Sequence, residues 1–225
     1  MQIKEIVLIL SGGKEVISKF YNEKLGFEIV KSSESLISFR AGRSLLTFKT
    51  DPEIKSAFYH FAFNIPSDQF TAAKNFISKS GIELITLDGD NEFNFVSWNA
   101  HSFYFHDPAG NIVEFISRHN LKNDSGQKFS KGSVIDISEI GLPADDVVSF
   151  CGELESESEF PPFTAVSPEF AALGNDNGLL IIVRNGRRWF PGCAPAKIFP
   201  VEIYAGSERG IKKIISKNNY KIMIE

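Results

Sequence analysis

The chain has 225 residues, 43% of them apolar and 23% charged, which is enough to bury one large core or two modest ones. A net charge of −4 gives no support for a protein that binds nucleic acids or anionic membranes. Apolar runs stay well short of a membrane-spanning helix, and the first residues lack the basic segment and apolar core of a secretion signal, so we expect a cytoplasmic protein.

The first quarter of the chain predicts a unit with the order βαβββ. A short apolar strand over residues 3–10 ends at a pair of glycines. Apolar residues then recur at helical spacing over residues 16–25, and Gly26 is suited to end that helix. Three short strands complete the unit, over residues 28–31, 35–40 and 44–50.

The same order of elements then repeats, and this repeat is the most informative feature of the sequence. A strand over residues 59–65 precedes a helix over residues 66–80, in which the apolar residues share one face. Three strands follow, near residues 82–87, 95–106 and 111–117. The last two form a hairpin, because the Asp-Pro-Ala-Gly sequence between them favours a tight turn.

The second half of the chain repeats the order less completely. Residues 119–133 are polar and contain glycine and serine, which is typical of a linker. A third unit then has a strand over residues 134–142, a helix from Pro143 and a hairpin over residues 170–183. Between the helix and the hairpin, residues 153–169 are acidic and rich in proline, so we expect a long loop there.

A fourth unit lacks its closing hairpin. Strands are predicted over residues 199–205 and 220–224, and a helix between them contains Ile211, Ile214 and Ile215.

The order of all these elements predicts an α+β fold of paired βαβββ units that form curled mixed sheets. The domain boundaries that follow are a complete first pair at residues 1–118, a linker at residues 119–133 and a degenerate, incomplete second pair at residues 134–225.

One carboxylate in the second unit needs a partner. Glu114 lies in the strand after the hairpin turn, where its neighbours are apolar. Alternation along the strand places it on the same face as Ile112 and Ile116, on the side that the sheet encloses. Because an unpaired buried charge is costly, Glu114 needs a partner, and a salt bridge to Arg118 beyond the end of the strand is one candidate.

Two motifs carry a resemblance to a known superfamily. The sequences FYNEKLGF at residues 20–27 and HDPAGNIVEF at residues 106–115 resemble the vicinal oxygen chelate superfamily. Its members include glyoxalases, extradiol dioxygenases, fosfomycin-resistance thiol transferases and bleomycin-binding proteins. The resemblance covers about the first 118 residues by motif and the remainder by the order of elements only. It implies a cup-shaped sheet, formed by two units around a divalent metal ion.

The resemblance implies three metal ligands, one from the first strand of each of the first two units and one from the final strand. These positions are Glu5, His60 and Glu114. One imidazole and two carboxylates suit Fe²⁺, Mn²⁺ or Mg²⁺. Two other interpretations remain open at this point, because Glu5 can be an edge charge paired with a lysine and His60 can be a packed core histidine.

The resemblance also implies residues that contact a substrate. Tyr104 matches a substrate-contacting tyrosine of the epoxide-opening relatives and can donate a hydrogen bond or a proton, although ordinary packing is an alternative. His101 is a candidate acid or base at the start of the same strand. Trp98 and Ser102 have the strand parity to line the pocket, unless a bulge intervenes.

The third and fourth units are predicted to bear no metal. Glu139 repeats the place of Glu5, but the positions that match the other two ligands fall near Pro200 and Ile182, which offer no donor side chain. We therefore expect the second half of the chain to be a scaffold.

The sequence thus predicts a metal-dependent enzyme, similar to the dioxygenases or the thiol transferases, that acts on a small oxygen-bearing molecule by Lewis-acid catalysis. The alternative is a non-catalytic protein of the bleomycin-resistance type that sequesters a small molecule, which the 21 Phe residues favour. A third interpretation is an assembly protein whose fourth unit is completed by another chain. The resemblance implies a homodimer, and we expect no nucleic-acid or membrane partner.

Overall fold

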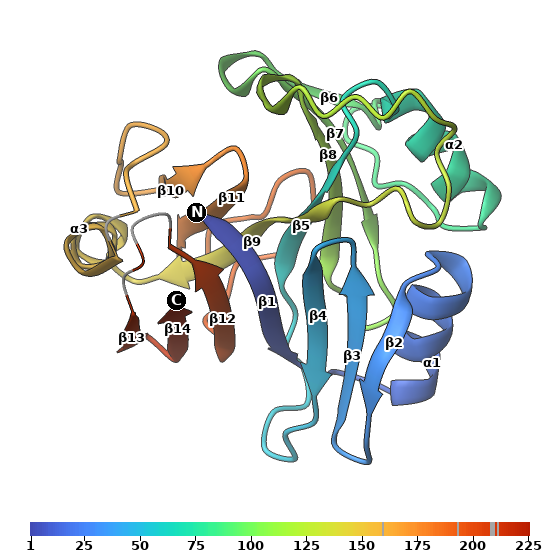
Figure 1. Ribbon diagram of the computed structural model, residues 1–225. Helices are drawn as coiled ribbons and strands as arrows, with labels where there is room; N and C mark the ends of the chain where they lie inside the picture. Colours follow the sequence, from blue (N-terminus) through green and yellow to red (C-terminus); the bar gives the residue numbers. More distant parts are fainter. Residues whose placement is uncertain (159, 193, 208–209, 211) are drawn as a thin grey trace.

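The computed structural model describes residues 1–158, 160–192, 194–207, 210 and 212–225. Its elements confirm the predicted fold class, because the chain is α+β and is built from paired βαβββ units (Figure 1). Within these residues, no helix is both long enough and apolar enough to cross a membrane.

The first two units contain helices and strands in the predicted order. The first has β1 (Gln2–Ile9), α1 (Lys14–Ser18) with a π-helical extension (Lys19–Lys24), β2 (Glu28–Ser32), β3 (Leu36–Ala41) and β4 (Ser44–Lys49). The second has β5 (His60–Ile65), α2 (Phe70–Lys79), β6 (Phe93–Phe95), a 3₁₀ turn (Val96–Trp98), β7 (Ala100–His106) and β8 (Ile112–Arg118). Residues 82–87 form isolated bridges, such as the one between Leu84 and Phe105, where a strand was predicted.

The third and fourth units are shorter. The third has β9 (Asp136–Ala144), α3 (Val147–Ser158), β10 (Phe170–Asn175) and β11 (Gly178–Arg184). The fourth has β12 (Val201–Gly206), β13 (Lys213–Lys217) and β14 (Tyr220–Ile224). A 3₁₀ turn (His119–Leu121) begins the segment between the second and third units.

Helix α3 extends into the stretch that was predicted as a loop. Residues 153–158 belong to it, and its buried positions are Val147, Phe150, Cys151, Leu154 and Ser158. These positions recur at helical spacing, so burial of one face outweighs the acidic composition of the other. Glu153 and Glu157 are on the outer side and both form ion pairs with Lys217. Glu159 lies outside the described residues.

A strand replaces the helix that was predicted in the fourth unit. β13 pairs with β14, and its isoleucines alternate, with Ile215 buried and Ile214 63% exposed. This alternation is the period of a strand, not of a helix. Ile211, the remaining residue of the predicted helix, lies outside the described residues.

The four units pair as two half-sheets, the first unit with the fourth and the second unit with the third. β5 runs antiparallel to β9, so the second and third units form the inner half-sheet, β5–β11. β1 runs antiparallel to β12, so the first and fourth units form the outer half-sheet, β1–β4 with β12–β14. This arrangement differs from the expectation that the first two units pair with each other, because β9 lies where β1 was expected.

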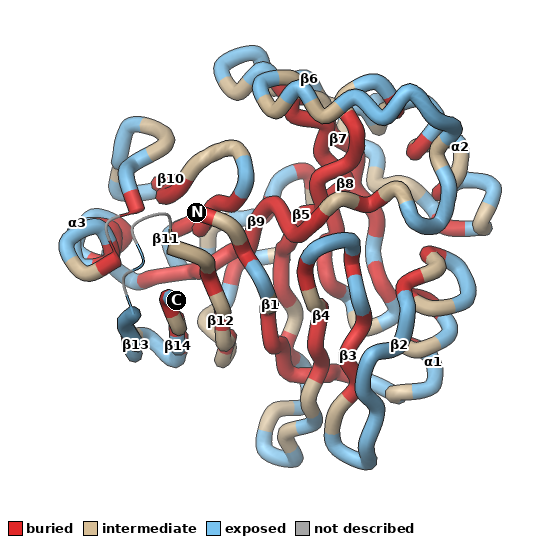
Figure 2. The backbone as a smooth tube through the Cα atoms, in the orientation of Figure 1, coloured by how far each residue is buried: buried red, intermediate tan, exposed pale blue. Residues whose placement is uncertain are grey.

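The two half-sheets share one apolar core. Ile3 of β1 and Ile137 of β9 form a pair that links them, and both side chains are fully buried. One cluster of buried side chains extends through all four units, and Figure 2 shows buried backbone running from β8 through β5 and β9 to β1. A smaller, largely aromatic cluster lies on the inner half-sheet and borders the candidate site.

Candidate metal centre and its pocket

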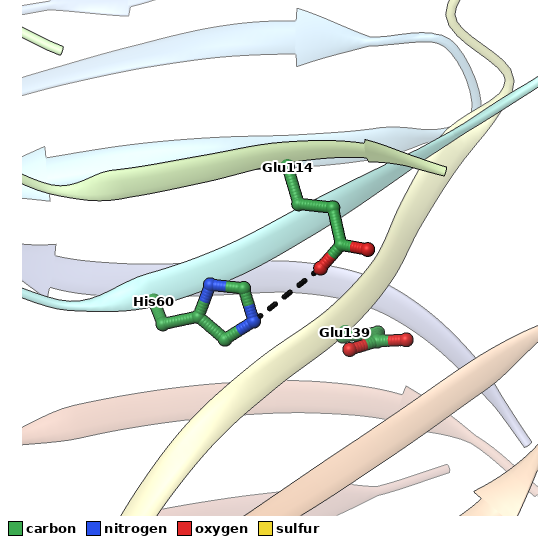
Figure 3. A group of neighbouring side chains, drawn as sticks. All are labelled: His60, Glu114 and Glu139. Atoms are coloured by element: carbon green, nitrogen blue, oxygen red, sulfur yellow. Dashed lines mark ion pairs between the residues drawn. The ribbon is translucent and has the colours of Figure 1, made fainter. Parts of the chain in front are cut away.

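Three strands of the inner half-sheet bring together one imidazole and two carboxylates. His60 begins β5, Glu114 lies in β8 and Glu139 lies in β9 (Figure 3). One ligand atom from each residue lies within 4.8 Å of the other two, and all three residues are buried. Among the described residues, this is the only group of three such side chains.

The strand register explains why these residues meet. Ala62 of β5 lies directly opposite Glu114 of β8 and also directly opposite Glu139 of β9. Residues directly opposite one another in a sheet point to the same face, so the two carboxylates flank Ala62. His60 points to that face too, because it lies two residues before Ala62 in the same strand. The small side chain of Ala62 leaves the space between them open.

Hydrogen bonding sets the tautomer of His60. Its Nδ1 lies 3.2 Å from the carbonyl oxygen of Ile112, and because a carbonyl oxygen only accepts, Nδ1 carries the proton. Burial lowers the pKa of His60 to about 4, so the ring is neutral at pH 7. The lone pair of Nε2 therefore faces Glu114 Oε2 at 3.5 Å. This arrangement requires a proton or a metal ion between the two atoms.

Glu114 has little solvent to stabilise its charge. Burial, followed by the nearby charge of Glu139, raises the pKa of Glu114 to about 8, although Ser102, Tyr104 and Arg118 act in the opposite direction. In the metal-free protein the carboxyl group thus holds its proton at pH 7. A metal ion between Glu114 and His60 would replace that proton.

A buried arginine holds Glu139 in place. Arg118 is fully buried and donates from its guanidinium to Glu139 and from Nε to Ser138 Oγ at 3.1 Å. Its Cζ lies 5.4 Å from the centroid of the Trp98 ring. The sequence left open a salt bridge between Arg118 and Glu114. In the structure Arg118 forms its salt bridge with Glu139 instead. Arg118 orients one candidate ligand from behind, as residues around metal ligands commonly do.

A cavity of about 350 Å³ lies over the three residues. Its aromatic walls are Phe95, Trp98, Phe170, Trp189 and Phe190. The Trp189 ring lies against the His60 ring, with centroids 5.1 Å apart. Gly141 permits this approach, because a Cβ atom at that position would lie 2.5 Å from the Trp189 ring. The candidate ligands therefore form the polar floor of a pocket whose walls are mainly aromatic.

Solved structures match the chain over its whole length, although no protein-family model matches it and no curated protein matches it by sequence. A Bacillus subtilis protein named as a candidate dioxygenase matches with a TM-score of 0.67 and 13% identity, over 100% of this chain and 85% of its own. Glyoxalase I from Zea mays matches with a TM-score of 0.61 and 15% identity, over 99% of this chain and 91% of its own.

This chain has the vicinal oxygen chelate fold. The two matches cover all four units, so the resemblance that the motifs of the first half carried is confirmed at the level of the fold for the second half as well. At these identities the likeness establishes the fold, and the activity has to be argued from the site.

Within this fold, Tyr104 and Trp98 line the cavity, where the sequence analysis expected them. Tyr104 lies directly opposite Glu114. Burial, followed by the charge of Glu114, raises the pKa of the Tyr104 phenol well above its usual range, so the phenol keeps its proton. Ser102 is buried behind it and donates a hydrogen bond to the Tyr104 oxygen at 3.3 Å. Ser102 supports Tyr104 and is not part of the cavity wall.

His101 lies on the other face of β7. Its Nδ1 is 2.9 Å from Nε2 of His119, and its ring packs against Phe70 of α2. Alternation along the strand explains the placement, because His101 is one residue away from Ser102 and so points the opposite way. The structure therefore removes His101 from the candidate site, where an acid or base was expected.

Glu5 lies in the outer half-sheet and does not join the group. Its carboxylate accepts a hydrogen bond from Thr47 at 2.5 Å, and its partner across the strands is Tyr204 of β12. The physical reason is strand pairing, because β9 takes the place beside β5 that was assigned to β1. The third side chain of the group is that of Glu139. The repeat predicts Glu139 as the counterpart of Glu5, but we expected the half of the chain that contains it to be a scaffold.

The side chains of His60, Glu114 and Glu139 fit a divalent metal ion. An imidazole nitrogen with carboxylate oxygens is a suitable set for Fe²⁺, Mn²⁺ or Mg²⁺. Two carboxylates are buried here, and one buried guanidinium, that of Arg118, offsets only one of them. Asp176 also lies 3.6 Å from this guanidinium, so a divalent cation would balance the two negative charges that remain, one of which the metal-free protein balances with a proton on Glu114.

Proposed function

We propose that the protein is a metal-dependent enzyme of the vicinal oxygen chelate type, with His60, Glu114 and Glu139 as its metal ligands and a small oxygen-bearing molecule as its substrate. The observation that carries this proposal is the convergence of Nε2 of His60 with two buried carboxylates at the floor of an aromatic cavity. The fold shared with a glyoxalase I supports it. We further propose that the protein acts in the cytoplasm as a homodimer.

The side chains of the pocket have distinct parts in this proposal. A bound divalent ion would supply Lewis acidity to oxygen atoms of the substrate. Tyr104 holds a proton opposite Glu114 and can donate it to a substrate oxygen. Arg118 keeps Glu139 oriented and offsets part of its charge. The aromatic walls exclude water from the face where the ligands lie.

Metal binding tests the proposal directly. Protein freed of metal by a chelator is titrated with Mn²⁺, and binding is followed by calorimetry and by the melting temperature. We expect His60→Ala, Glu114→Gln and Glu139→Gln each to weaken Mn²⁺ binding by at least about tenfold, because even the loss of a group that supports a ligand commonly costs that much.

Glu5→Gln is the matched control, since it makes the same chemical change at the position that the sequence predicted as a ligand. It should keep the affinity of the unmodified protein, because Glu5 lies outside the group of three. Full affinity in Glu139→Gln together with lost affinity in Glu5→Gln would overturn the assignment of the site to the inner half-sheet.

A non-catalytic binding protein is the second candidate, and the aromatic walls of the cavity are the observation that favours it. Such a protein would hold an aromatic compound equally well with and without Mn²⁺. Absence of Mn²⁺ binding in the unmodified protein, with retained binding of aromatic compounds, would decide for this candidate over the enzyme.

A further inference from the structure

We propose that the substrate is an aromatic molecule that also carries a negatively charged group, and that Arg187 receives this group. The inference rests on the proposed function for the identity of the site. Its own evidence is the part of the cavity wall that lies outside the three candidate ligands.

Arg187 is the positively charged residue of the cavity wall. It is half-buried in the segment that follows β11. Its Cζ lies 5.3 Å from the centroid of the Phe170 ring, a contact that positions a guanidinium without neutralising it. No carboxylate of the described residues forms an ion pair with Arg187, whereas Arg184, three residues earlier, is paired with Glu169. Arg187 thus presents an uncompensated positive charge to the cavity.

The other charged groups around the cavity have partners without a metal ion. Glu114 lies against His60, and Arg118 is shared between Glu139 and Asp176, which lies 3.6 Å from its guanidinium. Among the described residues of the cavity wall, Arg187 is the charged group that lacks a partner of opposite charge. Because apolar walls reduce the screening by water, this charge favours an anionic group on the bound molecule over a neutral one.

The rest of the wall selects a flat, apolar body. Six of the lining residues are aromatic with Tyr104 included, and the Phe95 ring contacts both Trp98 and Phe190, with centroids 6.2 and 5.8 Å apart. Aromatic faces and edges bind other rings in stacked or edge-on geometry. The cavity volume of about 350 Å³ is near the lower end of ligand pockets, which suits a compound with one or two rings.

The tryptophans of the chain give a direct measurement of occupancy. The chain has 2 Trp residues, Trp98 and Trp189, and both line the cavity. Quenching of tryptophan fluorescence therefore reports a molecule in this cavity. Suitable probes are 4-nitrobenzoate and 4-nitrobenzamide, which share a non-fluorescent ring and differ in charge.

The decisive titrations use metal-free protein, so that the carboxylate of the probe cannot ligate a metal ion. We expect 4-nitrobenzoate to bind at least about tenfold more tightly than 4-nitrobenzamide, because a guanidinium forms strong, charge-assisted hydrogen bonds with a carboxylate. Arg187→Gln should remove this preference and leave the affinity for the amide unchanged. Arg184→Gln, the matched control, should behave as the unmodified protein, because Arg184 is engaged with Glu169.

Equal binding of the two probes, absence of quenching by either, or an unchanged preference in Arg187→Gln would overturn the inference. The affinity for the amide shows whether each variant keeps an intact cavity. Loss of Mn²⁺ binding with a retained charge preference would count against the proposed metal function alone. Normal Mn²⁺ binding without a charge preference would count against the role of Arg187 alone.

Discussion

Glu114 and His60 shift the stability of the metal-free protein in opposite directions as the pH changes. The pKa of Glu114 is raised from 4.5 to about 8, so between these values the folded protein holds a proton that the unfolded chain releases. Its contribution to stability is full at low pH and is lost as the pH rises through 8. The pKa of His60 is lowered from 6.5 to about 4, so its contribution is full above 6.5 and is lost as the pH falls through 4.

Between pH 6.5 and 8, Glu114 is the one of these two groups that titrates. We expect the metal-free protein to lose up to about 2 kcal/mol of its free energy of unfolding across this window, since each pKa unit corresponds to about 1.4 kcal/mol. Glu114→Gln should remove most of that loss, because the amide resembles the protonated carboxyl group. Urea unfolding at both pH values, with a chelator present, measures the difference. An equal loss in the variant would contradict the assignment.

The residues of the candidate site differ in how far the sequence could predict them. Glu114 and His60 were placed correctly on one face because strand alternation is encoded locally. Tyr104 followed from the same alternation. His101 was placed on the wrong side, although its parity along the strand already opposed that of Ser102. The face of the sheet to which a side chain points can thus be predicted from the sequence. The residue that lies opposite it on a neighbouring strand, such as Glu139 opposite Ala62, cannot.

At the scale of elements, the outer half-sheet repeats the register of the inner one. Val7 of β1 lies opposite Thr47 of β4 and Glu202 of β12, just as Ala62 lies between the two carboxylates of the inner half-sheet. Glu5 lies two residues before Val7 and so corresponds to the histidine of the candidate site. The outer half-sheet therefore has polar residues at all three corresponding places.

Neighbouring side chains already satisfy the polar residues of the outer half-sheet. Thr47 donates a hydrogen bond to Glu5, and Lys49 forms an ion pair with Glu202. The Lys49 ammonium thus supplies the positive charge that a metal ion would supply in the inner half-sheet. Because lysine and a divalent cation compete for the same carboxylate, we expect no metal there.

Elemental analysis of Mn²⁺-loaded protein checks this expectation. We predict about one metal ion per chain in the unmodified protein and nearly none in Glu139→Gln, because Glu139 is a ligand of the inner half-sheet. Glu202→Gln changes the corresponding residue of the outer half-sheet and should keep one ion per chain. Two ions per chain in the unmodified protein would show that the outer half-sheet also binds metal.

Element types were predictable where an apolar pattern was long, and less so where it was short. The repeated βαβββ order of the first two units could be predicted from the sequence because each helix and strand carries its own periodicity. β13 has only five residues, and two adjacent isoleucines there fit a helix or a strand equally well. The pairing of β5 with β9 could not be predicted at all, since partner choice depends on contacts between residues far apart in the chain.

At the scale of the whole molecule, the last strand lies inside the outer half-sheet. β14 pairs with β12 on one side and β13 on the other, so it is not an open edge. It also ties the half-sheets together, because the Tyr220 hydroxyl donates to the carbonyl oxygen of Pro143 in β9 at 2.6 Å and the Tyr220 ring contacts Phe150 of α3. The strand therefore pairs within the fourth unit and also contacts the third.

Deletion of residues 220–225 should therefore lower the melting temperature while leaving Mn²⁺ binding measurable. The deletion removes the buried side chains of β14 and unpairs two strands, but none of the three candidate ligands lies in the outer half-sheet. Scanning calorimetry and Mn²⁺ titration of the shortened protein measure both effects. A shortened protein that melts at the original temperature and loses only self-association would assign the strand to the interface of the proposed homodimer instead.

The segment between the second and third units divides the candidate ligands along the chain. His60 and Glu114 precede residues 119–133 and Glu139 follows them, and residues 130–132 are exposed. A single cut there would yield one fragment with two ligands and another with one, joined by the pairing of β5 with β9. The metal ion would then bridge two separate polypeptides, and its binding free energy would add to that of their association. The concentration of free metal would thus set the fraction of fragments that are assembled.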